Sequence, residues 1–301
     1  MRVQNPWRIV ASRDTADLTR LLAGEEPITT VMSERFLRHA LDRRLRRGGR
    51  FLVREPLSVV YQGPGGFFIP FRINETVEGN DGSSRGDPGC STRSDFLSCE
   101  RALRRRIGAF NSVRTIMGTT GDVEVLNRVL GVTPGQSVDY DLLRLDVAEY
   151  SSLGPPPAEG LTVRRMSSGD WRLLFDLQMA YEQEEVLLPG NVPVPSHSKA
   201  HLLDSLARQL VLAAMYHGEV IGRVATNARG FHTDQVGGVF TVPSWRGRGV
   251  ARWLMTHLLH LLGKERRNAT LFVKHTNPAA QQLYRGLGFR FESPFRISYY
   301  P

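Results

Sequence analysis

Cysteine and lysine are scarce in this chain. The 301 residues include two cysteines, Cys90 and Cys99, which are too few for a disulfide framework or a four-ligand zinc site. We therefore expect free thiols in a reducing compartment and no bound metal. Only three of the 39 basic side chains are lysine, so arginine carries nearly all of the formal net charge of +9. This charge indicates a general affinity for anions and specifies no fold.

Long apolar runs are absent as well. No window approaches the roughly 18–20 apolar residues that a membrane-spanning helix needs, and the start, MRVQNPWRIVASRD, lacks the apolar core of a signal peptide. We therefore expect a soluble, cytoplasmic protein without membrane contacts. The composition, 41% hydrophobic and 23% charged, is typical of globular proteins. The length suits two domains of about 150 residues each.

Two segments interrupt the chain. Residues 74–95 are rich in Gly, Ser, Asp and Asn, which predicts a long flexible loop. Residues 151–160, SSLGPPPAEG, predict a proline-stiffened linker between a domain over 1–150 and a domain over 161–301. Strands alternate with helices in the second half, which indicates an α/β layered fold.

Periodicity and turn residues define the elements of the second domain. His217-Gly218 predicts a tight hairpin between two strands, and Ser167, Ser168 or Asp170 caps the first helix. The expected helices cover 169–185, 199–208, 250–262 with a stop at Gly263, and a last helix from the Asn277 cap to Gly288. Strands are expected at 235–242 and 269–274, and one or two strands close the chain.

The two halves of the chain resemble each other. Residues 114–132 align with 271–289 at a constant offset of 157, with five identities. Each segment is preceded by a similar strand, GGFFIPF at 65–71 and GGVFTVP at 237–243. We infer a duplicated domain, with chance similarity of two α/β segments as the alternative.

The stretch SWRGRGVARW, residues 244–253, joins a strand to the helix predicted over 250–262. Glycines in this loop allow a positive φ and a close approach to a ligand. The first turn of a helix offers unpaired N–H groups and the positive end of the dipole, so an anion is expected there. The pattern predicts a pyrophosphate-binding loop, and a glycine turn with solvated arginines is the alternative. Its spacing matches neither the dinucleotide fingerprint nor the P-loop.

A second motif, NPAAQQLYRGLGF, follows about 26 residues later. Together the two motifs resemble the GNAT superfamily of acyl-CoA-dependent N-acetyltransferases, over roughly residues 160–301. Arg246–Ala251 fits the family's [QR]-x-x-G-x-[GA] loop, and Asn277, Tyr284 and the Leu-Gly-Phe at 287–289 fit its second signature. The resemblance implies an α/β (α+β) fold with a mixed, mostly antiparallel twisted sheet flanked by helices.

The resemblance also implies where acetyl-CoA, the cosubstrate, would bind. The fourth strand (236–242) and the fifth (269–274) would splay apart around its pantetheine arm, which would pair with backbone groups of Phe240, Thr241 and Val242. The pyrophosphate would bind the N–H groups of Arg246, Gly247, Arg248, Gly249, Val250, Ala251 and Arg252. Asn277 would contact the cosubstrate or cap its helix.

Catalytic roles follow from the same resemblance. Tyr284 would protonate the departing CoA thiolate, although a tyrosine on an apolar helical face is otherwise a core residue. The amine must be neutral to attack, so a base or a water chain is needed. The candidate bases are Glu184 and Glu185, with Asp234 and His275 as less central choices, and each is otherwise a surface charge. A backbone N–H of the fourth strand would hold the oxyanion.

The first half departs from the family pattern. Asn127 stands at the tyrosine position, and the 74–95 insertion replaces the pyrophosphate loop. Residues 85–90, RGDPGC, echo the loop, but Asp87 would place a carboxylate among phosphates. We therefore interpret residues 1–150 as a degenerate GNAT-like domain without cosubstrate binding, as in bacterial two-domain members, that shapes the acceptor site or binds a partner.

Arginine clusters at 41–50 and 100–108 are the candidates for nucleic-acid contact. Aromatic residues do not interleave with them, and both fit the solvated faces of amphipathic helices, which is the interpretation we favour.

Three hypotheses of function result. The first is an N-acetyltransferase that moves an acetyl group from acetyl-CoA to a primary amine by direct transfer in a ternary complex. The second is a non-catalytic acyl-CoA sensor or scaffold, and the third is a nucleic-acid-binding protein. The amine acceptor is not specified by the sequence, although the loop over 187–201 is expected to line its site. A monomer and a homodimer both fit.

Overall fold

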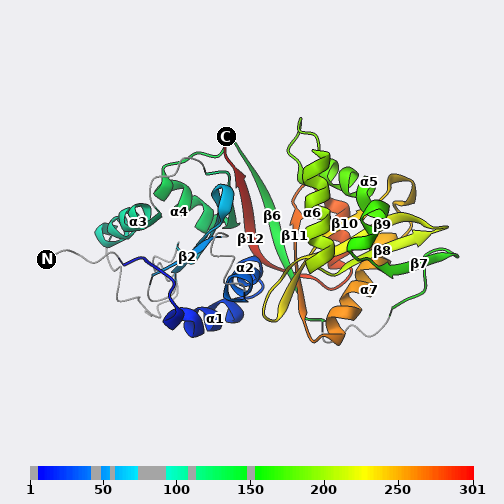
Figure 1. Ribbon diagram of the computed structural model, residues 1–301, viewed down its shortest axis with the longest axis horizontal. Helices are drawn as coiled ribbons and strands as arrows, with labels where there is room; N and C mark the ends of the chain where they lie inside the picture. Colours follow the sequence, from blue (N-terminus) through cyan, green and yellow to red (C-terminus); the bar gives the residue numbers. More distant parts are fainter. Residues whose placement is uncertain (1–5, 42–48, 55–57, 74–92, 108–112, 148–152) are drawn as a thin grey trace. The chain divides into compact units, whose positions relative to one another are not determined.

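The computed structural model describes residues 6–41, 49–54, 58–73, 93–107, 113–147 and 153–301 (Figure 1). Their contacts divide the chain into two compact units. Unit 1 comprises Met1–Leu142, Lys274–Thr276 and Ser293–Pro301, and unit 2 comprises Leu143–Val273 and Asn277–Glu292. The last residues of the chain therefore fold with its first half.

Unit 2 is a mixed α/β unit. Its elements are β7 (Leu161–Arg165), α5 (Trp171–Tyr181), α6 (Pro195–Arg208), β8 (Val211–Tyr216), β9 (Glu219–Arg229), β10 (Thr233–Thr241), α7 (Val250–Lys264), β11 (Asn268–Lys274) and α8 (Pro278–Arg285). Strands β7 to β10 pair antiparallel in sequence order, and β10 pairs parallel with β11. The mixed, mostly antiparallel sheet flanked by helices confirms the predicted fold class.

Helices cover both faces of the unit 2 sheet. Successive side chains of a strand point to opposite faces. Along β8, Val211, Ala213 and Met215 therefore pack in the cluster formed with α5 and α6, whereas Leu212 and Ala214 pack in the cluster formed with α7 (Figure 1). The apolar stripe predicted for α7 is the centre of the second cluster, which fixes the helix and its first turn against the sheet.

Unit 1 has a related topology. Its elements are β1 (Arg8–Ile9), α1 (Thr15–Gly24), α2 (Thr30–Leu41), β2 (Arg50–Arg54), β3 (Ser58–Gln62), β4 (Phe67–Phe71), α3 (Arg93–Ile107), β5 (Thr115–Thr119), α4 (Thr120–Leu130), most of β6 (Gln136–Leu145) and most of β12 (Arg290–Tyr299). Strands β1 to β4 pair antiparallel, β4 pairs parallel with β5, and β5 pairs antiparallel with β12. The order β4, α3, β5, α4 matches β10, α7, β11, α8, in agreement with the sequence repeat.

Local signals predicted several element ends correctly. The Ser167 amide and hydroxyl donate to Asp170 Oδ2 at 2.9 and 2.8 Å, a capping box at the start of the turn that leads into α5. His217 and Gly218, with φ of 48° and 86°, form the hairpin turn between β8 and β9.

Other element ends differ from the predictions. Helix α7 runs through Gly263 to Lys264, because the chain reverses at Arg266, whose φ is 54°. Helix α6 begins at Pro195, where proline suits the first turn, so the loop expected over 187–201 is confined to 187–194. Helix α8 ends at Arg285, and a turn carries the chain to Gly288.

The arginine clusters are only partly described. Residues 42–48 and 74–92 lie outside the described residues, and with them most of the 41–50 run and of the 74–95 loop. In α3 the side chains of Ala102, Leu103 and Ile107 are buried, whereas Arg104 and Arg105 are exposed. The helix is therefore amphipathic with a solvated arginine face, as predicted for residues 100–108.

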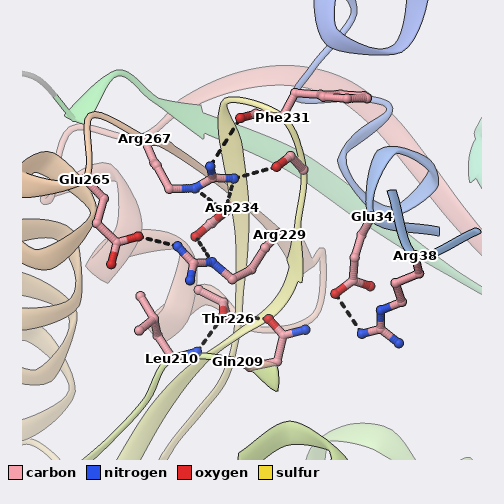
Figure 2. Close-up of polar contacts among 11 residues, drawn as sticks. Glu34, Arg38, Gln209, Leu210, Thr226, Arg229, Phe231, Asp234, Glu265 and Arg267 are labelled. Carbon is pink, nitrogen blue, oxygen red and sulfur yellow. Dashed lines mark hydrogen bonds and ion pairs between the residues drawn. The ribbon is translucent and has the colours of Figure 1, made fainter. Parts of the chain in front are cut away.

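A buried carboxylate braces one end of the unit 2 sheet (Figure 2). Asp234, 0% exposed near the start of β10, accepts from Arg229 Nε at 2.8 Å and from Arg267 Nε at 2.7 Å. Arg267 also donates to the Gly230 carbonyl oxygen at 2.6 Å, and Arg229 pairs with Glu265. Asp234 therefore joins the β9–β10 hairpin to the turn between α7 and β11, which is a structural role. We do not retain it as a candidate base.

Replacement of Asp234 by alanine is expected to destabilise the protein by about 3–5 kcal/mol, because it leaves two arginines without their shared anion. The measurement is the free energy of unfolding from denaturant titration. The control is Asp204→Ala, which removes an exposed carboxylate 2.6 Å from Arg208; this change is expected to cost about 0–1 kcal/mol. Equal effects of the two substitutions would contradict the bracing role.

Candidate functional site

The strands β10 and β11 part halfway along their length. Their parallel pairing runs from Thr233–Asn268 to Val236–Leu271, and beyond Val236 the strand β10 pairs only with β9. The edge of β10 that faces β11 therefore has no strand partner at Phe240 and Thr241. Open backbone groups of this kind can pair with an extended ligand.

A bulge lies in the open half of β10. The register to β9 shifts between Gly237 and Phe240, and Gly238 has a φ of 58°. A Cβ atom on Gly238 would lie 2.8 Å from Arg223 Nη2, so a side chain here would displace that buried arginine. The two glycines thus permit both the left-handed backbone and the close approach of β9 side chains.

The loop that follows β10 leaves its amides open. Gly249, with a φ of 83°, is the residue before α7, and no side chain caps the helix. Among the described residues, the N–H groups from Gly247 to Arg252 donate to no backbone oxygen. They lie at the positive end of the α7 dipole, so the loop suits a diphosphate held by backbone.

The arginines of this loop bind protein groups. Arg246 Nε donates to the Thr241 carbonyl oxygen at 3.0 Å, and its Nη2 lies 2.7 Å from Glu184 Oε2. The guanidinium of Arg252 donates to the Gly286 carbonyl oxygen at 2.9 Å, which ties α7 to the end of α8. These side-chain contacts brace the loop without using its amides.

Asn277 is the N-cap residue of α8. Its Oδ1 accepts from the Ala280 amide at 3.0 Å, so it caps the helix, and its Nδ2 donates to Glu185 Oε1 at 3.4 Å. Of the two alternatives for Asn277, capping is therefore the one observed. The same side chain joins α8 to the acidic turn after α5.

Tyr284 lies on α8, near Tyr181 and Glu185. It is 7% exposed, its ring meets Phe289 edge-on at 5.9 Å, and among the described residues its hydroxyl has no hydrogen-bond partner. Burial raises the pKa of Tyr284, and Tyr181 and Glu185 raise it further by charge repulsion. The phenol is consequently protonated at neutral pH, as a general acid must be.

The four candidate bases occupy different surroundings. Glu185 lies near Asn277, Tyr181 and Tyr284, whereas Glu184 forms an exposed ion pair with Arg246. His275 Nε2 lies 2.9 Å from Asp141 Oδ1, and both residues belong to unit 1. Only Glu185 is thus brought to the tyrosines, and His275 joins Asp234 among the candidates that we discard.

A buried polar network behind the site was missed in the sequence. Arg223 on β9 donates to Gln178 Oε1, and Gln178 Nε2 donates to Glu182 Oε1 at 2.6 Å. Ser198 donates to the other oxygen of Glu182. Two features of the sequence could have indicated this network: Arg223 lies within an apolar strand, and Gln178 and Glu182 are four residues apart.

The helix α5 changes its winding at this network. After Tyr181 the chain continues as a π-helical turn, Glu182–Val186, which carries all three glutamates of the YEQEEV stretch. Such turns interrupt α-helices frequently at functional sites. The wider turn separates Glu182, which is buried, from Glu184 and Glu185. These two contact the residues that precede α7 and α8.

Two further properties concern metals and membranes. Within the described ranges, no group of three or more His, Cys, Asp or Glu side chains could hold a metal ion. None of the helices that the structure describes has the length and apolar character to cross a bilayer.

Known proteins share this architecture. Residues 171–289 match the model of the acetyltransferase (GNAT) family. Among solved structures, a Drosophila protein has a TM-score of 0.67 at 13% identity, covering 98% of this chain and 99% of its own. A GNAT-family acetyltransferase from Colwellia psychrerythraea has a TM-score of 0.55 at 10% identity, with coverages of 98% and 99%.

A GCN5-related N-acetyltransferase-like protein from Streptococcus suis has a TM-score of 0.51 at 15% identity, covering 96% of this chain and 99% of its own. No curated protein sequence matches the chain significantly. At these identities the structures report the fold alone, so the assignment to a family rests on the family model. Residues 171–289 of this chain belong to the acetyltransferase (GNAT) family.

Proposed function

We propose that unit 2 transfers an acetyl group from acetyl-CoA to a primary amine by direct transfer in a ternary complex. The observation that carries this proposal is the open half of β10, which leads directly into a loop of unpaired amides. An extended amide-bearing chain that ends in a diphosphate fits these two features together. Coenzyme A has that chemistry, and the family to which residues 171–289 belong supports it.

Each part of the site has a task in this proposal. Backbone groups of Phe240 and Thr241 pair with the pantetheine arm, and the amides from Gly247 to Arg252 bind the diphosphate. Two of the groups predicted for these tasks are already paired: the Val242 amide donates to the Ile221 carbonyl oxygen at 3.0 Å, and the Arg246 amide donates to the Pro243 carbonyl oxygen at 3.2 Å. The acetyl thioester supplies the activated acyl group. An amide of β10 faces the acyl oxygen, where a fixed dipole stabilises developing charge.

Tyr284 and Glu185 carry the protons. Burial holds the Tyr284 phenol in its neutral form, so it has a proton to give to the leaving thiolate. Glu185 is oriented by Asn277 and takes a proton from the amine, directly or through water. Glu184 is the alternative base, but its ion pair with Arg246 favours a role in bracing the loop.

Unit 1 is proposed to lack cosubstrate binding. The carboxylate of Asp122, 4% exposed in α4, accepts from the amides of Arg72 and Ile73, at 3.2 and 2.8 Å. These amides directly follow β4, where the open loop follows β10 in unit 2. Tyr300 donates to Asn127, the residue at the tyrosine position. A carboxylate at this place repels phosphate, which supports the interpretation of a degenerate domain.

Substitution of Tyr284 by phenylalanine tests the acid. Turnover with acetyl-CoA is expected to fall about 10²-fold with the affinity for acetyl-CoA retained, because the thiolate then leaves without a proton. The measurement is thiol release in the presence of a panel of primary amines. Tyr299→Phe, which removes a half-buried hydroxyl from β12, is the control for loss of a hydroxyl. Unchanged turnover of the Tyr284 variant would exclude it as the acid.

The loop is tested by Gly249→Val. A β-branched residue does not tolerate a φ of 83°, so the amides shift and the affinity for acetyl-CoA is expected to fall about tenfold or more. Calorimetric titration measures the affinity. Gly218→Val imposes the same strain at a φ of 86° in the β8–β9 hairpin and is expected to leave binding unchanged. Equal binding by both variants would contradict the assignment of the loop.

The same titration tests unit 1. One acetyl-CoA is expected to bind per chain, because Asp122 occupies the amides that would serve a second site. Binding of two equivalents of acetyl-CoA per chain would overturn the interpretation of unit 1 as a degenerate domain. Binding without acetylation of any amine would instead favour the sensor hypothesis.

A further inference from the structure

Tyr181 is a half-buried tyrosine to which the proposed reaction assigns no role. It is the last residue of α5, immediately before the π-helical turn. Its ring meets that of Phe240 edge-on at a centroid distance of 6.1 Å, and the guanidinium carbon of Arg223 lies 5.6 Å from its centroid. Tyr181 therefore lies against the half of β10 that has parted from β11.

The bulge of β10 brings a backbone amide to the same place. Arg223 Nη2 would lie 2.8 Å from a Cβ atom on Gly238, so Tyr181 and Gly238 share this arginine as a neighbour. Burial raises the pKa of Tyr181, and the charges of Glu185 and Glu182 raise it further, while the charge of Arg223 and a hydrogen bond from the Gly238 backbone lower it. A phenol oxygen that accepts from an amide becomes a stronger donor through its own O–H.

Arg223 is held in place by buried hydrogen bonds. It is 3% exposed, it donates to Gln178, and Gln178 in turn donates to the buried Glu182. Its Nε is buried and has no hydrogen-bond partner. A buried guanidinium with an unused donor is costly for folding, so its retention calls for a functional reason.

We propose that Tyr181 is a third catalytic residue of the acyl transfer, donating a hydrogen bond to the thioester oxygen, and that Arg223 is the positioning residue that orients it. This inference rests on the proposed function. The amine nitrogen forms a bond to the acyl carbon, the oxygen gains and then returns negative charge, and the carbon–sulfur bond breaks. Tyr181 keeps its proton throughout. Tyr284 protonates the sulfur, and Glu185 receives the proton of the amine.

In the proposed function an amide of β10 stabilises the acyl oxygen, and the inferred role of Tyr181 changes how this amide acts. The Gly238 amide acts on the acyl oxygen through the tyrosine hydroxyl. Both the amide dipole and the Arg223 charge then favour negative charge on that oxygen, and they act against the nearby charges of Glu182 and Glu185.

The test compares the two tyrosines with acetyl-CoA and the primary amine that the wild-type protein acetylates fastest in a panel of amino acids, polyamines and peptides. Tyr181→Phe is expected to lower kcat about 10²-fold, as removal of an oxyanion donor does, with KM for acetyl-CoA within about threefold. Tyr299→Phe remains the control. S-phenyl thioacetate separates the roles, because its thiolate leaves without protonation. It should restore turnover to Tyr284→Phe and not to Tyr181→Phe.

Arg223 is tested by Arg223→Gln and Arg223→Lys. The first is expected to lower kcat as Tyr181→Phe does, and the second, which retains a cation, to recover part of the loss. If Arg223 had only a structural role, both Arg223→Gln and Arg223→Lys would be less stable, and the lysine variant would not recover kcat. Because Arg223→Gln risks unfolding, Tyr181→Phe decides the proposal alone.

The outcomes separate the two levels of inference. Wild-type turnover with unchanged kcat in Tyr181→Phe would overturn the role of Tyr181 and leave the proposed acetyl transfer intact. Rescue of Tyr181→Phe by the phenyl thioester would reassign Tyr181 as an acid and also overturn it. A wild-type protein that releases no thiol with any amine would overturn the proposed function and this inference together.

Discussion

The parting of β10 from β11 after Val236 is the constraint on which the site depends. Backbone N–H and C=O groups in a protein interior require partners, so a strand that loses one neighbour must be held by other means. Here β9 continues to pair with β10, and α7 packs its buried Leu254, Leu258 and Leu262 against the sheet. These contacts support the edge that β11 leaves, and they hold the amides at the start of α7 at its end.

The arginines illustrate how little net charge says about function. The +9 balance suggests a protein that binds polyanions, yet the described arginines of unit 2 mostly serve the protein itself. Arg229 and Arg267 hold Asp234, Arg246 holds Glu184, and Arg252 holds a carbonyl oxygen. The loop before α7 thus offers neutral amides of fixed direction, while Arg246 and Arg252 are engaged with protein groups.

The two units show that a shared topology does not preserve a site. Both contain a parallel strand pair with a helix between its strands and a helix after it. In unit 2 the helix α8 begins with a neutral asparagine that caps it and contacts Glu185. In unit 1 the helix α4 carries Asp122, whose carboxylate binds the amides that follow β4. The Asp122 carboxylate thus occupies backbone amides after β4 in unit 1, whereas the amides of the corresponding loop in unit 2 have no backbone partner.

The sequence alone determined the features that local chemistry controls. The Ser167–Asp170 capping box, the His217-Gly218 hairpin, the α7 stripe and the Asn277 cap all depend on neighbours within a few residues, and the two motifs identified the family. Tertiary structure decided which polar groups meet. Asp234 and Glu185 are both carboxylates in the sequence, but pairing of β9, β10 and the turn before β11 surrounds Asp234 with arginines, while the π-helical turn brings Glu185 to α8. Likewise Tyr181 and Arg223 are 42 positions apart in the chain. They meet because α5 crosses β9, and such contacts depend on packing that periodicity does not encode.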